Sequence, residues 1–188
     1  MSDDPEAAER KMRFLFALRQ RGVTDPRVLE AMERIDRGEF VRGHFEDRAY
    51  DDTPLPIPCG QTMPDPFVAA RIAEAAELAD HHRVLEIGTG SGYTTAILAR
   101  LCATIISIER FQTLAIAARE RLQRLGFANA SVVWGDGLAV NAESGLFDRI
   151  IIHARLDDVP PALLGALSVD GVMLVAQRSS AAGAAPVV

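Results

Sequence analysis

Lysine is nearly missing from this chain of 188 residues, which contains only Lys11. Enzymes that form a Schiff base need a lysine, and so does the phosphate-binding loop GxxxxGK, so the sequence offers almost no candidate for either. Cysteine is also rare. Cys59 and Cys102 lie far apart with no CxxC pair, which predicts neither a zinc site nor a disulfide framework. No cluster of His, Cys and carboxylates has ligand spacing, so we expect no metal.

The charge balance and the lack of long apolar runs limit the partners that the protein is expected to bind. The chain has 20 basic and 26 acidic side chains and a net charge of −6, which argues against a nucleic-acid partner. No run of about 18 apolar residues occurs, so we expect no membrane partner. The first residues, MSDDPEAAER, are acidic and polar and do not resemble a secretory leader, so we expect a cytoplasmic protein.

Strand-like and helix-like segments alternate from about residue 66 onward. Short apolar runs predict five strands, and Asp-Pro pairs and glycines mark the ends of several helices. The expected strands are 83–87, 104–108, 130–134, 147–152 and 172–176. The expected helices are 2–22, one starting at 25–26, 65–79, 91–102, 112–125 and 160–167. This alternation is typical of an α/β fold with a mostly parallel sheet and helices on both faces.

The chain is expected to form a single domain, 1–188, with three regions. Residues 1–65 contain the first helices and a stretch with three prolines, 38–60, whose irregular pattern predicts an ordered loop region packed on a core. We expect residues 1–65 to form a helical cap over a cleft. Residues 66–176 form the predicted cofactor-binding α/β core. Residues 177–188 are rich in Ala, Gly and Ser, and we expect a frayed tail.

The segment VLEIGTGSGY, residues 84–93, is the most informative stretch of the sequence. A predicted strand ends directly before Gly88, Gly90 and Gly92, and a predicted helix follows. Glycines permit a tight turn and a close approach of the main chain to a ligand, and the start of the helix presents unpaired N–H groups. Open α/β sheets bind ligands at this edge of the strands. The sequence therefore predicts a ligand site here.

The spacing of the glycines decides between two cofactors. Dinucleotide-binding enzymes carry GxGxxG or GxGxxA, and Tyr93 stands at the last of these positions, which argues against a dehydrogenase. GxGxG after an acid, Glu86, resembles the first motif of class I methyltransferases. That resemblance implies S-adenosyl-L-methionine as cofactor, with Glu86 near its amino group, Glu109 on the ribose hydroxyls and Asp136 near the adenine amino group. The predicted cofactor-binding residues are Gln61, Thr62, Glu86, Gly88, Thr89, Gly90, Gly92, Glu109, Arg110, Asp136 and Gly137.

Longer stretches carry a family resemblance. They are RAYDDTPLPIPCGQT (48–62), RVLEIGTGSGYTTAILARL (83–101), SIER (107–110), GDG (135–137), FDRIII (147–152) and VPPALL (159–164). These stretches resemble the protein-L-isoaspartate (D-aspartate) O-methyltransferases. The resemblance implies a Rossmann-like class I methyltransferase fold and methyl transfer to the α-carboxylate of L-isoaspartyl residues in damaged proteins or peptides. The ester collapses to a succinimide that can reopen as aspartate, so the implied role is protein repair.

The departures from the family pattern lie on the substrate side. Where the family has GQTIS, this chain reads GQTMP, so Pro64 replaces a serine regarded as the active-site residue. Proline has neither a hydroxyl nor an N–H, so the usual donor is lost. His153 and Arg155 follow the fourth predicted strand, at the ligand end of the sheet, where they could hold a carboxylate. The predicted catalytic residues are Thr62, which the family pattern keeps, His153 and Arg155. Asp65 is either the N-cap of the next helix or a changed substrate contact.

The end of the chain also departs from the family, which adds two strands after the fifth. Too few residues follow here for such a pair. We expect a shortened C-terminal edge of the sheet, through which the chain can form an oligomer.

Three alternatives stay open. In the first, the chain is a catalytically altered or inactive family member that binds the cofactor. In the second, it methylates a different carboxylate. In the third, it belongs to another class of methyltransferase. Enzymes that methylate nucleic-acid bases commonly carry two prolines and an aromatic residue after the fourth strand, where this chain has His153, Ala154, Arg155 and Leu156. The last alternative is therefore disfavoured.

Overall fold

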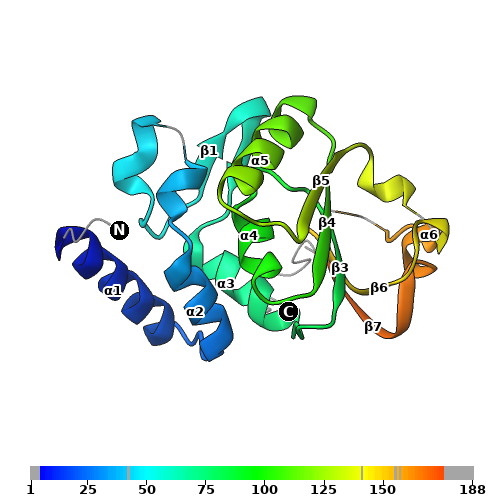
Figure 1. Cartoon of the computed structure of the whole chain (residues 1–188), viewed down its shortest axis with the longest axis horizontal. Coiled ribbons are helices and arrows are strands. Elements are labelled where there is room, and N and C mark those ends of the chain that lie inside the picture. Colours follow the sequence, from blue (N-terminus) through cyan, green and yellow to red (C-terminus); the bar gives the residue numbers. More distant parts are fainter. Residues whose placement is uncertain (1–4, 42, 141, 155, 157, 176–188) are drawn as a thin grey trace, which may run out of the picture.

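The computed structural model describes residues 5–41, 43–140, 142–154, 156 and 158–175. Its centre is a parallel sheet of five strands in the order β5-β4-β3-β6-β7 (Figure 1). The strands are β3 (Arg83–Ile87), β4 (Thr104–Glu109), β5 (Ala130–Trp134), β6 (Phe147–Ile152) and β7 (Leu167–Val175). The order of strands reverses between β3 and β6, which confirms the predicted Rossmann-like class of fold.

Alternate side chains of the strands enter two separate cores. Val84 and Ile151 point to one face, and Leu85 and Ile150 point to the other. The first face packs against α3 (Pro66–Ala75), α4 (Tyr93–Ala99) and α5 (Gln112–Arg124), and the second against α6 (Pro161–Leu164). In Figure 1, α1 to α5 lie on one side of the sheet and α6 lies on the other. Helices cover both faces as predicted, but unequally.

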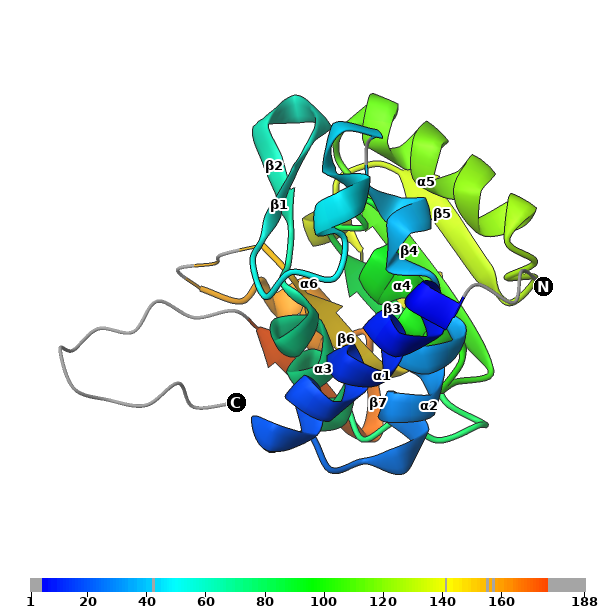
Figure 2. The same cartoon turned by 90° about the vertical axis from the view of Figure 1, so that its left-hand side faces the viewer.

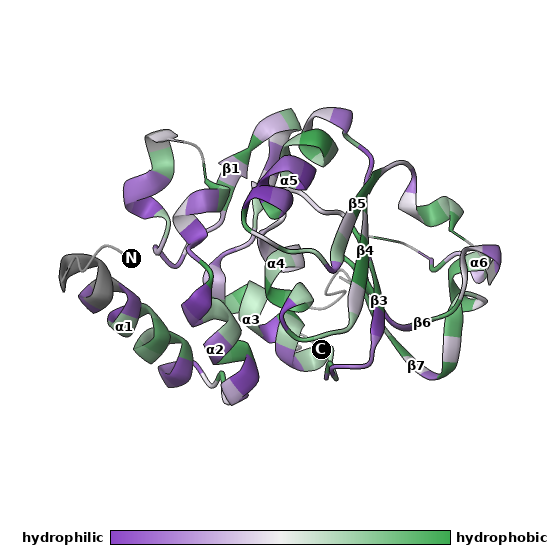
Figure 3. Cartoon of the chain, in the orientation of Figure 1, coloured by the Kyte–Doolittle hydropathy of each residue, from purple (hydrophilic) through white to green (hydrophobic). Residues whose placement is uncertain are grey.

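Local signals start and end the N-terminal helices. Asp25 caps α2 (Pro26–Arg34) by accepting the main-chain N–H groups of Arg27 and Val28. The preceding helix, α1 (Pro5–Gln20), ends before Gly22, whose φ of +93° suits glycine. Hydrophilic residues recur along α1, α2 and α5, as expected for helices with one face toward water (Figure 3).

The stretch 38–60, predicted as an ordered loop region, contains short regular elements. It contains the 3-10 turns η1 (Arg37–Phe40), η2 (Gly43–Arg48) and η3 (Pro58–Gly60), and β1 (Leu55–Ile57), which pairs with β2 (Gln61–Met63) as an antiparallel hairpin. The prediction did not include the hairpin, because three prolines hid a short alternation in which Pro56 is exposed and its two neighbours are buried. A two-stranded ribbon tolerates such a proline. Figure 2 shows the hairpin standing apart from the five-stranded sheet.

Several other boundaries differ from the predicted ones, and α3 ends at Ala75 rather than at 79. The helix after the glycine turn is 93–99 rather than 91–102, α6 ends at Leu164, and β7 begins at Leu167 rather than at 172. The register of β7 against β6 shifts between Phe147 and Arg149, and Asp170 in this strand has a φ of +65°. An irregular strand of this kind lacks the regular alternation that reveals a strand in a sequence.

The predicted tail, 177–188, lies outside the described residues. Among the residues that the structure describes, no helix is both long enough and apolar enough to cross a membrane.

Candidate active site

The candidate site lies where three strands end at the carboxyl edge of the sheet. Ile87, the last residue of β3, lies opposite Ile108 of β4 and Ile152 of β6. The Gly88 N–H donates to the Ile108 carbonyl at 2.8 Å, and the His153 N–H donates to the Ile87 carbonyl at 2.9 Å. The residues that follow the three strands are therefore brought together at the point where the strand order reverses, which is where sheets of this kind bind ligands.

The turn after β3 requires glycine at three positions. Gly88, Gly90 and Gly92 have φ angles of +99°, +56° and +86°, which side chains rarely permit. The hairpin also approaches this turn, because a Cβ on Gly90 would lie 3.3 Å from Ile57 Cδ1. The N-terminal region of the chain and the α/β core therefore meet at the glycine turn.

The Glu109 carboxylate is fixed beside this turn. One oxygen accepts the Gly90 N–H at 2.9 Å and the other accepts the Phe111 N–H at 3.0 Å, and the residue is 4% exposed. A carboxylate oxygen has two lone pairs, so each of these oxygens can accept one further hydrogen bond. The arrangement fits two neighbouring hydroxyl groups such as those of a ribose.

Glu86 is fully buried in a polar network. Its Oε2 accepts the hydroxyls of Thr95 and Ser107 at 2.5 and 2.6 Å, and its Oε1 lies 2.9 Å from His153 Nε2. The Thr89 and Ser107 hydroxyls are 2.5 Å apart. A buried charge needs such partners, and these come from β4, from α4 and from the residues that follow β3 and β6. Glu86 therefore joins the elements around the site, and its contact with a cofactor stays a prediction.

His153 lies between this network and the glycine turn. Its side chain is 21% exposed, and a Cβ on Gly88 would lie 3.2 Å from its own Cβ. Because Nε2 is engaged by Glu86, Nδ1 is the ring nitrogen left to meet a ligand. Arg155, which the sequence places two residues further on, lies outside the described residues.

Cys102 is buried and feels the charge of Glu86. Burial, and then the negative charge of Glu86, raise the pKa of the Cys102 thiol to about 12. This cysteine is therefore a packing residue rather than a nucleophile.

The loop after β5 carries Asp136 and Gly137. Asp136 is exposed and caps the turn η4 (Gly137–Ala139) by accepting the Leu138 N–H at 2.9 Å. The main chain at Gly137 packs closely against the last residue of β3, because a Cβ at this position would be 2.5 Å from Ile87 Cγ2. Glycine at 137 thus has a packing reason, and it brings Asp136 to the same edge as the glycine turn.

Trp134 lies beside the candidate site and was not among the predicted site residues. It is opposite Glu109 in the β4–β5 register, and its indole N–H donates to the Arg110 carbonyl at 3.1 Å. The side chain is 55% exposed, which is unusual for a large aromatic residue. The sequence signal that could have indicated it is its position at the end of the predicted strand 130–134, on the edge where the site was expected. Arg110 itself is exposed, with its guanidinium carbon 4.7 Å from the centre of the Phe111 ring.

The segment from β2 to α3 carries the residues predicted for the substrate side. The Gln61 amide donates to the Cys59 carbonyl at 3.1 Å, and Thr62 is exposed. Asp65 caps α3 by accepting the Val68 N–H at 3.0 Å, which confirms the first of its two expected roles. The Pro64 carbonyl accepts a hydrogen bond from Arg37 at 2.8 Å. The segment is therefore fixed at residues 64 and 65.

Arg37 was also missed. It is fully buried, which is rare for arginine, and its second terminal nitrogen donates to the Ala49 carbonyl. Burial lowers the pKa of its guanidinium group. No feature of its neighbourhood in the sequence indicated that this one of many arginines would be buried.

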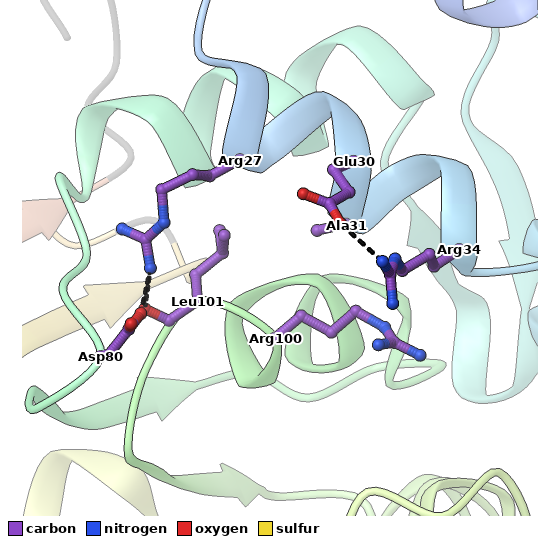
Figure 4. A pocket seen from close by; sticks show the side chains of 7 residues that line it. All are labelled: Arg27, Glu30, Ala31, Arg34, Asp80, Arg100 and Leu101. Atoms are coloured by element: carbon purple, nitrogen blue, oxygen red, sulfur yellow. Dashed lines mark hydrogen bonds and ion pairs between the residues drawn. The ribbon is translucent and has the colours of Figure 1, made fainter.

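A separate hollow of about 210 Å³ lies between α2 and the end of α4 (Figure 4). Its lining residues are Arg27, Glu30, Ala31, Arg34, Asp80, Arg100 and Leu101. Arg27 pairs with Asp80 and Arg34 pairs with Glu30, and no predicted site residue lines it. It is therefore separate from the candidate active site. In the described ranges, no group of three or more His, Cys, Asp or Glu side chains has an arrangement that could hold a metal ion.

The five-stranded parallel sheet, the glycine turn after its first strand and the fixed carboxylate after its second define a class I methyltransferase fold. The profile of the family described as protein-L-isoaspartate(D-aspartate) O-methyltransferase matches residues 9–181, and the chain belongs to this family. The protein-L-isoaspartate O-methyltransferase of Paracoccus denitrificans (strain Pd 1222) is 59% identical over 175 residues, 93% of this chain and 81% of that protein. That of Rhodopseudomonas palustris (strain BisA53) is 49% identical over 164 residues, 87% of this chain and 76% of that protein.

Solved structures agree with this membership. A protein-L-isoaspartate O-methyltransferase superposes with a TM-score of 0.80 at 27% identity over 89% of this chain, which spans about half, 55%, of that longer chain. A β-aspartate methyltransferase from Plasmodium falciparum, solved in complex with S-adenosyl-L-homocysteine, gives 0.76 at 26% identity, over 89% of this chain and 84% of that one.

Proposed function

We propose that this chain transfers the methyl group of S-adenosyl-L-methionine to the free α-carboxylate of L-isoaspartyl residues in damaged proteins or peptides. One observation carries the proposal: in a chain of this family, the Glu109 carboxylate is fixed by Gly90 and Phe111 beside three glycines. When bound, this cofactor supplies a methyl group on a positively charged sulfur, from which a nucleophile can displace it directly.

The residues of the chain then have to orient the acceptor rather than activate it. A carboxylate is already ionised at neutral pH, so no general base is needed. Alignment of the reacting groups can contribute about 7–11 kcal/mol to catalysis. We propose that Thr62, His153 and Arg155 hold the acceptor carboxylate. The exposed position of Thr62 and the partly exposed ring of His153 support this role.

The cofactor side involves residues from both regions of the chain. We propose that residues 66–176 form the cofactor-binding core and that residues 1–65 close over it as a cap, which adds Gln61 and Thr62 to the cofactor contacts. Glu109 receives the ribose hydroxyls, and the remaining proposed contacts are Gln61, Thr62, Glu86, Gly88, Thr89, Gly90, Gly92, Arg110, Asp136 and Gly137. The contact of Ile57 with the glycine turn supports this division, because it joins the two regions at the site.

The product of the transfer is a methyl ester at the α-carboxyl group. The neighbouring main-chain nitrogen attacks the ester carbonyl, methanol leaves and a succinimide forms, and water can open this ring to a normal aspartyl residue. The macromolecular partner is therefore a damaged protein or peptide. Among the described residues, β7 is the outermost strand on its side of the five-stranded sheet, and an oligomer along this strand stays a proposal. The cytoplasmic location and the exclusion of nucleic-acid and membrane partners stay predictions.

Transfer of a labelled methyl group to an isoaspartyl peptide tests the proposal, with the same peptide carrying a normal aspartate as the control. We expect a base-labile ester on the isoaspartyl peptide only. Thr62→Val removes the hydroxyl at nearly constant volume and is expected to lower kcat/KM about tenfold or more, which is the loss of one hydrogen bond to a charged group. Equal labelling of the two peptides, or of neither, refutes the assignment.

Pro64 favours the alternative of an altered or inactive family member, because the serine position has no donor. A Pro64→Ser variant and calorimetry with S-adenosyl-L-homocysteine decide this alternative. If the natural chain binds S-adenosyl-L-homocysteine but forms no ester, and Pro64→Ser does form the ester, the natural chain has lost the acceptor contact. Binding with transfer only to unrelated carboxylates identifies a changed substrate.

A further inference from the structure

Two arginines enclose a pair of aromatic rings between the glycine turn and the segment that follows the hairpin. In order, these residues are Arg121, Phe40, Tyr93 and Arg37, and we call them the arginine–aromatic ladder. The Arg121 guanidinium carbon lies 5.8 Å from the centre of the Phe40 ring. The two rings are 5.5 Å apart in an edge-to-face arrangement, and the Arg37 guanidinium carbon lies 5.3 Å from the centre of the Tyr93 ring. Distances below about 6 Å permit cation–π attraction.

Each end of the ladder holds a main-chain carbonyl at the candidate site. Arg121 Nη1 donates to the Ser91 carbonyl, inside the glycine turn, at 2.9 Å. Arg37 Nη2 donates to the Pro64 carbonyl at 2.8 Å, and its Nη1 donates to Ala49. One end is therefore fixed to the turn proposed to bind the cofactor, and the other to the segment proposed to hold the acceptor.

Local structure brings the four side chains together. Arg37 and Phe40 are the first and last residues of the 3-10 turn η1, where side chains three apart lie on the same side. Asp36 caps this turn by accepting the Gly38 N–H at 2.8 Å. Tyr93 is the first residue of α4 and follows the last glycine of the turn directly. The ladder is therefore tied to the cofactor side by its rings as well as by Arg121.

The burial of these groups indicates a role that packing alone does not explain. Burial lowers the pKa of both guanidinium groups, as expected for charges removed from water. Within the described residues, Arg37 Nε and the Tyr93 hydroxyl have no hydrogen-bond partner. An apolar side chain would fill the same space without this disadvantage, but it would not hold the carbonyls of Ala49 and Pro64.

We propose that the arginine–aromatic ladder sets the position of the acceptor segment relative to the cofactor turn. Arg37 positions residues 61–65, and Arg121 positions residues 88–92. This inference rests on the proposed function. Neither arginine is a catalytic residue, because both act through main-chain carbonyls.

Lysine substitutions at the two ends test the proposal, because lysine keeps the charge but lacks the planar fork of donors. We expect Arg37→Lys to raise the KM for an isoaspartyl peptide at least fivefold and to leave the Kd for S-adenosyl-L-homocysteine within twofold. We expect Arg121→Lys to raise the Kd for S-adenosyl-L-homocysteine at least fivefold and to leave the KM for the peptide within twofold. Arg119→Lys is the matched control: Arg119 lies on the same helix and donates to the Val132 carbonyl at 2.8–3.0 Å, outside the ladder. It should leave both constants within twofold.

Amide hydrogen exchange on the free protein gives a readout that does not depend on turnover. Arg37→Lys should speed exchange in 61–68 and leave 88–93 unchanged, and Arg121→Lys should do the opposite. If both variants change both segments, or both constants, in proportion to their loss of Tm, the arginines are merely structural and the proposal fails. If the natural chain forms no ester, the proposed function fails, and the exchange and binding measurements still decide the role of the ladder.

Discussion

Replacing Glu109 by glutamine removes one negative charge at the site and leaves the size of the side chain nearly unchanged. In the folded protein the carboxylate accepts the N–H groups of Gly90 and Phe111. The amide of glutamine can accept only one of them, and its NH₂ group then faces the other N–H. Hydrogen bonds to charged groups are worth about 1.5–3 kcal/mol each, so we expect the free energy of unfolding to fall by about that amount.

The same substitution removes an acceptor for a ribose hydroxyl. A loss of about 1.5–3 kcal/mol in binding corresponds to roughly 10–150-fold weaker affinity for S-adenosyl-L-homocysteine. Calorimetric titration measures this affinity, and urea unfolding measures the stability separately. The fluorescence of Trp134, the single tryptophan, gives an independent titration because its indole lies opposite Glu109 in the β4–β5 register.

Asp148→Asn is the matched control for Glu109→Gln. Asp148 accepts the Arg83 N–H at 2.8 Å and the Ser168 hydroxyl at 3.1 Å, at the amino edge of the sheet rather than at the carboxyl edge. We expect it to reduce stability and to leave the affinity for S-adenosyl-L-homocysteine unchanged. If Glu109→Gln binds as tightly as the natural chain, the ribose role is refuted. If the control weakens binding equally, the effect is a general loss of stability.

Three further predictions concern stability. Gly137→Ala places a Cβ 2.5 Å from Ile87 Cγ2, so we expect overpacking to lower the free energy of unfolding by about 1–3 kcal/mol in urea titrations; an unchanged midpoint would show that the loop moves freely. Tyr93→Phe removes a buried hydroxyl without a described partner and should leave this free energy unchanged or raise it by about 1 kcal/mol, whereas a marked loss would reveal a hydrogen bond to the hydroxyl. The Arg83 N–H lowers the pKa of Asp148, so ionised Asp148 contributes stability that is fully present above about pH 4 and is lost as the pH falls through the folded-state pKa. The stability difference between the natural chain and Asp148→Asn should therefore narrow in acid, and a difference that is constant with pH contradicts this account.

The features of the fold that were predictable from the sequence depend on short-range signals. The glycine turn requires positive φ angles at neighbouring positions, and the caps of α2 and α3 involve an aspartate and N–H groups two or three residues later. Each signal is contained in one short segment, so the residue types alone reveal it. The strands β3 to β6 were found for the same reason, since each contains a short apolar run, whereas only the second half of the irregular strand β7 was found.

The features that were missed depend on contacts between distant segments. Arg37 is buried because its donors meet carbonyl groups 12 and 27 residues further along the chain. The enclosure of Glu86 likewise needs hydroxyls from α4 and β4 and a ring that follows β6. The sequence predicts that Glu86 lies at the site, but the closure of its network depends on how three elements pack, which no local pattern contains.

The replacement at position 64 changes what the substrate-side segment can contribute. Pro66 restricts Asp65 to extended backbone, with φ −61° and ψ 161°, from which its side chain caps α3. Arg37 fixes the carbonyl of Pro64 at the same time. The segment is thus fixed at residues 64 and 65, and proline at position 64 brings no hydroxyl donor to it. A fixed main chain can position an acceptor carboxylate but cannot donate a hydrogen bond to it from Pro64, so the donors have to come from side chains beside this segment. If the Thr62 hydroxyl is to reach the acceptor carboxylate, the segment that contains Thr62 has to be placed correctly. Arg37 fixes this segment at Pro64, so the role proposed for Thr62 depends on Arg37.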